Sequence, residues 1–187
     1  MREKSGVGRT TRDYLRVGTA EAHDTLDVRL GALVEGDGRD YARFLDIQYR
    51  ARVNIESWLS ERCADTAPPR QTDVIARDLA ELGVSIPSHS PAFDVSADSD
   101  PLGTCWVLAG SSLGNRAILA RLVKAEMQWP VAFLSDRRVV EYWQRLRPFI
   151  ERPHSPVDDP PVLAAAQASF AHFNAVASQV GAPETTI

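Results

Sequence analysis

Three side chains near the start of the chain, Arg16, His23 and Asp27, share one face of an expected helix. Asp27 follows His23 by four residues, the spacing that brings two helical side chains together. A carboxylate that accepts the proton of one imidazole nitrogen leaves the other nitrogen free to bind a metal, and makes it a stronger donor. Arg16 could then contact negative charge at the edge of a bound cofactor. The alternative is a surface helix with three solvated side chains.

A further segment, residues 106–116, has the pattern of a helix that contains Gly110 and Gly114, one turn apart. A mid-helix glycine is unfavourable by about 0.5–1 kcal/mol relative to alanine, so the pair requires an explanation. One explanation is close packing against another helix. The other is that the missing side chains let the backbone lie against a flat macrocycle and let the helix bend. Nearby groups would then bind ordered water, at Ser111, Ser112 and Asn115.

Length and composition indicate one globular domain of 187 residues, with 44% hydrophobic and 25% charged residues. The net charge of -4 and the pI of about 5.6 argue against a nucleic-acid binder. Of the 21 basic residues only Lys4 and Lys124 are lysines, so 19 arginines remain for anionic contacts.

The start of the chain lacks the apolar core of a signal peptide, and no stretch approaches the roughly 20 apolar residues of a membrane-spanning helix. Cys63 and Cys105 are far apart in sequence and form no paired-cysteine motif, so we expect neither a zinc site nor a disulfide framework. These features predict a cytoplasmic protein that does not enter a membrane and whose thiols are reduced.

Apolar positions recur at helical spacing in at least five segments, and no run alternates as a strand does, so an all-α fold is predicted. The expected helices run from Thr10 or Thr11 to near Gly36, from Tyr41 to before Pro68, from Thr72 to Gly83, from about Leu102 to Lys124, from about Asp136 to Ile150, and from after Pro161 to Gly181. Residues 84–101 are predicted to form an extended loop.

On the fifth helix we expect four inward residues, Val139, Trp143, Leu146 and Phe149. His89 and His154 are expected in exposed loops, and His172 as a packing or surface histidine.

Two sequence patterns resemble the helices that enclose the cofactor in bacterial haem oxygenases. The pattern that resembles their proximal helix reads Leu15-Arg16-x-x-Thr19-x-x-x-His23-x-x-Leu26-Asp27. The pattern that resembles their distal helix reads Trp106-Val107-Leu108-Ala109-Gly110-Ser111-Ser112-Leu113-Gly114. The resemblance extends from Leu15 to the final helix, and is nearest to the subgroup often associated with bacteriophytochromes.

This resemblance implies a single-domain helical bundle over residues 1–187, with haem b between a proximal and a kinked distal helix, and with flexible termini at about 1–10 and 182–187. It implies that His23 ligates the iron and that Gly110 and Gly114 line the distal face. Further cofactor contacts are expected at Arg16, Asp27, Trp106 and Arg121, and distal polar groups at Ser111 and Asn115. Asn115 stands where family members commonly have another glycine, and Ser111 where the animal enzymes have aspartate.

The implied reaction opens haem with three molecules of O2 and external electrons, giving biliverdin, ferrous iron and carbon monoxide. Small distal residues and ordered water suit this chemistry. The implied partners are an electron donor, such as ferredoxin or a reductase, and a bacteriophytochrome that accepts biliverdin.

Two other functions are compatible with parts of the sequence. A haem carrier or sensor of the same fold would bind haem without degrading it. A helical di-iron oxidase needs two Glu-x-x-His pairs and further carboxylates. The one such match ends at His154 and contains the helix-breaking Pro153, which argues against that function.

Overall fold

The computed structural model describes residues 9–181, which fold into six α-helices without a β-strand among them. The helices are α1 (Thr11–Glu35), α2 (Gly38–Cys63), α3 (Thr72–Glu81), α4 (Pro101–Lys124), α5 (Arg137–Ile150) and α6 (Asp159–Gly181). The predicted all-α class is confirmed. Of the termini expected to be flexible, about 1–10 and 182–187, residues 1–8 and 182–187 lie outside the described residues.

Local side-chain chemistry explains where the helices begin. Thr10 caps α1 and Asp37 caps α2, each in a reciprocal capping box with the aspartate three residues later. Asp100 and Asp136 cap the free N–H groups of α4 and α5. Gly83 follows α3 with a φ of 72°, a conformation that side chains with a Cβ rarely adopt.

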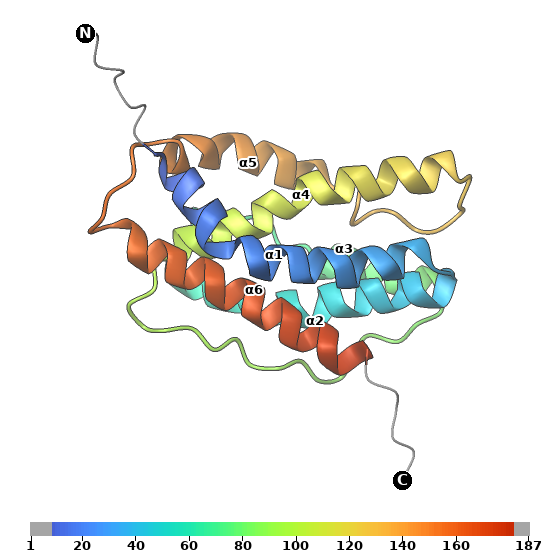
Figure 1. The fold of residues 1–187 in the computed structure, drawn as a ribbon. Helices are drawn as coiled ribbons and strands as arrows, with labels where there is room; N and C mark the ends of the chain where they lie inside the picture. Colours follow the sequence, from blue (N-terminus) through green and yellow to red (C-terminus); the bar gives the residue numbers. More distant parts are fainter. Residues whose placement is uncertain (1–8, 182–187) are drawn as a thin grey trace, which may run out of the picture.

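The last helix, α6, supports three of the other helices (Figure 1). It packs against α1, α4 and α2. Two glycines permit close approach to it: a Cβ on Gly103 of α4 would lie 1.9 Å from the Val162 carbonyl oxygen, and one on Gly18 of α1 would lie 2.6 Å from the Leu163 side chain. Both α1 and α4 therefore pack on α6, although they lie far apart in the sequence.

Two predictions for the second half of the chain were wrong. Phe149 is 63% exposed, because Ile150 occupies the inward position seven residues after Trp143. His154 is half-buried: its Nδ1 lies 2.6 Å from Asp159 Oδ2, and its ring stacks on Tyr14. His89 is exposed and His172 is buried, in agreement with expectation.

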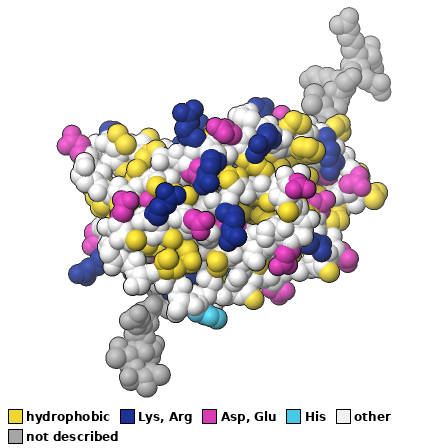
Figure 2. All heavy atoms as spheres, turned by 180° about the vertical axis from the view of Figure 1, so that it is seen from behind, with side chains coloured by type: hydrophobic (Ala, Val, Ile, Leu, Met, Phe, Trp, Pro, Cys, Tyr) yellow, Lys and Arg dark blue, Asp and Glu magenta, His cyan; other side chains and the backbone are white. Residues whose placement is uncertain are grey.

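The surface opposite to the view of Figure 1 carries both signs of charge. Figure 2 shows basic and acidic side chains interspersed there between patches of hydrophobic atoms. Within residues 9–181, no helix combines the length and the apolar character needed to cross a membrane.

Candidate functional site

His23 lies beside two carboxylates on α1 and remains accessible. Its Nδ1 lies 3.4 Å from Asp27 Oδ2 and 3.5 Å from Asp24 Oδ1, and its side chain is 52% exposed. The ring also contacts Phe170 of α6 edge-on, with 5.7 Å between centroids. With Nδ1 facing acidic groups, Nε2 is the nitrogen available to a metal. Asp24 is a carboxylate partner that the sequence pattern did not predict.

The two arginines predicted to bind cofactor carboxylates are both exposed and both paired with acidic residues. Arg16 lies 3.8 Å from Asp13 within α1, and Arg121 of α4 lies 3.1 Å from Glu35 at the end of α1. Exposed ion pairs of this kind contribute only about 0–1 kcal/mol, so either arginine can exchange its carboxylate for another anion. The Arg121–Glu35 pair also brings the C-terminal ends of α1 and α4 together.

The glycine pair of α4 faces open space. A Cβ added to Gly110 or to Gly114 would have no heavy atom within 4 Å, apart from its chain neighbours and the backbone of its own helix. The adjacent Leu113 is exposed by about half. The helix continues through both glycines. Close helix packing therefore explains Gly103, but it does not explain Gly110 or Gly114.

Ser111, next to the first of these glycines, is joined to a buried cation. Arg52 of α2 is 1% exposed and donates a hydrogen bond from Nη2 to Ser111 Oγ at 2.9 Å. Its Nε donates to Gln48 Oε1 at 3.2 Å. Ser111 in turn donates to the Leu108 carbonyl at 2.7 Å. A positive charge thus lies beneath α4, beside the open glycines.

Burial lowers the pKa of Arg52 to about 10, because the charged form loses solvation, while Glu56 and Asp136 partly offset this effect. The guanidinium therefore stays protonated at neutral pH. Its aromatic neighbours are Phe133 and Phe173, whose ring centroids lie 5.2 and 5.8 Å from the guanidinium carbon. These aromatic contacts and the two hydrogen bonds hold the guanidinium in place.

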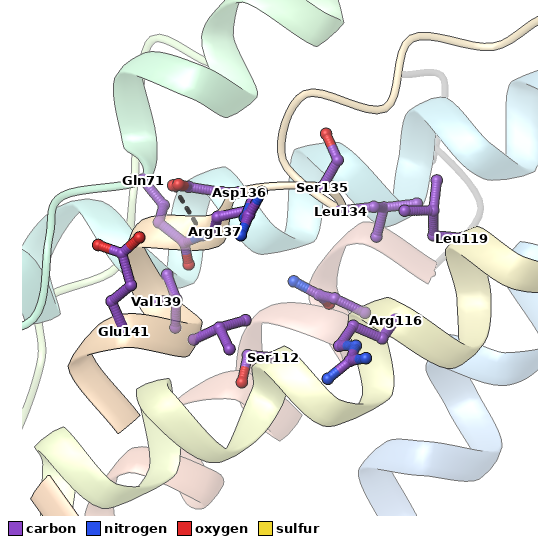
Figure 3. A pocket seen from close by; sticks show the side chains of 12 residues that line it. Gln71, Ser112, Arg116, Leu119, Leu134, Ser135, Asp136, Arg137, Val139 and Glu141 are labelled. Atoms are coloured by element: carbon purple, nitrogen blue, oxygen red, sulfur yellow. Dashed lines mark hydrogen bonds between the residues drawn. The ribbon is translucent and has the colours of Figure 1, made fainter. Parts of the chain in front are cut away.

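Asn115 lies on a different face of α4 from the glycines. It is buried, about 140° around the helix from Gly110, and lines a cavity of about 390 Å³ between α4, residues 134–136 and the start of α5. In Figure 3, α4 with Ser112 and Arg116 lies on one side of this cavity, and Asp136 and Glu141 lie on the other.

The remaining predicted cofactor contact, Trp106, is half-buried one turn before Gly110 and packs against the main core. The structure thus places His23 with Asp27 on α1, and Gly110, Gly114 and Trp106 along α4.

The Arg52–Ser111 contact was not predicted from the sequence. Its signal was the series Gln48, Arg52 and Glu56, three polar residues at four-residue spacing among the buried residues of α2.

Comparison with known proteins identifies the fold. Neither a protein-family model nor a curated protein matches the sequence. The structure superposes on the NO- and CO-bound haem oxygenase of Neisseria meningitidis with a TM-score of 0.69, covering 95% of this chain and 98% of that chain at 16% sequence identity. This chain therefore has the haem oxygenase fold.

Proposed function

We propose that this protein is a haem oxygenase that converts haem b, O2 and external electrons to biliverdin, ferrous iron and carbon monoxide. The observation that carries the proposal is the open backbone of α4 at Gly110 and Gly114, in a fold whose helix α1 presents an accessible His23 beside Asp27. Helix packing does not explain these two glycines, because no neighbouring helix within residues 9–181 approaches them. The absence of side chains there would let a flat ring lie close to the backbone of α4.

The described residues fit a haem. His23 Nε2 would bind the iron, while Asp27 and Asp24 hold Nδ1. Arg16 and Arg121 would exchange their exposed partners for propionates. Trp106 and the exposed Leu113 offer apolar contact to a ring.

Haem, which is both cofactor and substrate, supplies the iron that activates oxygen and the ring that is opened. A neutral histidine ligand donates less electron density than a cysteine thiolate, which would favour O–O cleavage. Gly110 and Gly114 leave room for a small ligand and for water. Arg52 stays protonated at neutral pH, because its pKa is about 10. We assign it instead to orient Ser111 and to favour negative charge on the open side of α4.

The test is to titrate the purified protein with haemin, and then to add a reductant under oxygen. We expect a histidine-ligated haem spectrum that disappears on reduction, with biliverdin identified by absorption and chromatography and ferrous iron by a chelator. A stable haem spectrum under oxygen and reductant would instead indicate a carrier or sensor. Absence of stoichiometric haem binding would reject both functions.

The proposal extends to partners that the resemblance implies. We expect an external electron donor, such as ferredoxin or a reductase, a cytoplasmic location, and a bacteriophytochrome as acceptor of biliverdin. Turnover with a purified ferredoxin system, and transfer of the product to an apo-bacteriophytochrome, test these assignments separately.

A further inference from the structure

The only two cysteines of the chain, 42 positions apart, line one cavity. Cys63 is the last residue of α2, and Cys105 lies in the first half of α4. The cavity has a volume of about 400 Å³ and is also lined by Thr66 and Tyr142. Both thiols are free, and both side chains line this one cavity.

The two thiols differ in accessibility. Cys105 is 3% exposed, whereas Cys63 is half-buried at the cavity wall. Cys63 Sγ also lies 3.3 Å from the Leu59 carbonyl oxygen. An oxidant that enters the cavity therefore reaches Cys63 first.

The thiols also differ in acidity. The hydrogen bond from Cys105 is the largest of the effects that lower the pKa of Cys63 to about 7. The same interaction, together with burial, raises the pKa of Cys105. Because the thiolate is the reactive form of cysteine, this difference reinforces the order set by accessibility.

We propose that Cys63 and Cys105 form a peroxide-sensitive dithiol, in which Cys63 is the attacking residue and Cys105 the resolving residue. The product is an intramolecular disulfide that joins the end of α2 to the first half of α4. This inference concerns the thiols alone and does not depend on the proposed reaction with haem.

The chemistry requires one molecule of hydrogen peroxide per pair of thiols. The Cys63 thiolate attacks one peroxide oxygen, the O–O bond breaks, and hydroxide leaves, so that Cys63 becomes a sulfenic acid. Loss of the negative charge on Cys63 removes one cause of the raised pKa of Cys105. The Cys105 sulfur then attacks the Cys63 sulfur, the S–O bond breaks, and the departing oxygen leaves as water after taking up a proton. The two thiols are oxidised by two electrons, and the peroxide is reduced to two water molecules.

The experiment treats the reduced, haem-free protein with one equivalent of hydrogen peroxide at neutral pH, followed by a thiol-blocking reagent. Trypsin without reductant should yield peptides 63–70 and 78–116 joined by a disulfide, and dithiothreitol should separate them. We expect loss of both titratable thiols and a rise in the thermal unfolding midpoint that dithiothreitol reverses.

Two single variants assign the order of attack. Cys105→Ser should still react, but stop at a sulfenic acid on Cys63 that a dimedone probe traps. Cys63→Ser should consume peroxide at least about tenfold more slowly, because the remaining thiol is buried and protonated. Only intermolecular dimers, or only sulfinic acid on Cys63 in the parent protein, would overturn the proposal. Equal rates in the two variants would overturn the assigned roles.

Discussion

Replacing Gly114 with alanine should make the haem-free protein more stable and the haem-dependent reaction poorer. An added Cβ there meets no neighbouring atom within 4 Å, so the substitution carries no steric cost in the structure. Alanine is favoured over glycine inside a helix by about 0.8–1 kcal/mol. In a domain of this size, that gain corresponds to a rise of about 2–4 °C in the unfolding midpoint.

The effect on function should have the opposite sign, because the open space beside Gly114 is where we place the ring and its small ligand. Gly114→Leu should still bind haem through His23, but form little or no biliverdin. Gly114→Ala should be intermediate. The measurements are the haem-free unfolding midpoint, haem affinity by absorption titration, and biliverdin yield per haem, each made on the same preparation.

Gly103 of the same helix provides the matched control. Its added Cβ would lie 1.9 Å from the Val162 carbonyl oxygen and 2.9 Å from the Ala166 nitrogen, so the backbone must move. We expect Gly103→Ala to destabilise the haem-free protein by about 1–3 kcal/mol. If Gly114→Ala behaved like Gly103→Ala, Gly114 would be a packing glycine. If well-folded Gly114→Leu turned over fully, the distal pocket would lie elsewhere.

Three further predictions concern the side chains around the open face. The His23→Ala variant should bind haem loosely and lack turnover, and added imidazole should partly restore activity. The Asp27→Ala variant should lose about 10–100-fold in haem affinity or activity. An unchanged ferric haem spectrum in His23→Ala would show that His23 is not the iron ligand. The Arg16→Ala and Arg121→Ala variants should bind haem more weakly and form a mixture of biliverdin isomers, since each guanidinium fixes ring orientation. Chromatography of the products measures the ratio of isomers. An unchanged ratio in the double variant would contradict the assignment. The Arg52→Met variant should still bind haem. It should bind fluoride, a small anionic ligand of ferric haem, about tenfold more weakly, because the buried positive charge of Arg52 is lost. Equal fluoride affinity in the parent and the variant would show that Arg52 is purely structural.

The helices could be predicted from the sequence because their signals are local. Apolar spacing identified each core face, and residues such as Thr10 and Asp136 set helix starts through their own side chains. Of the two errors, the inward position assigned to Phe149 was a misjudged local spacing, since Ile150 takes that position, whereas the one at His154 depended on distant partners. His154 is held by Asp159 and by Tyr14 from the start of α1, and no local pattern predicts that Tyr14 reaches it.

The open face of α4 marks the limit of what the sequence can specify. Gly103 and Gly110 lie seven residues apart on one helix, and a local pattern offers the same two explanations for both. In the structure α6 crosses α4 at Gly103 and leaves Gly110 uncovered, so tertiary packing alone decides which glycine is structural. The same reasoning applies to Arg52, whose contact with Ser111 joins positions 59 residues apart. A buried, charged side chain needs hydrogen-bond partners, and one partner of Arg52 is Ser111, the residue next to the uncovered Gly110. The residues that the sequence explains least well, an unpacked glycine pair and a buried arginine, thus meet at one place, and that coincidence is the strongest argument that the place is functional.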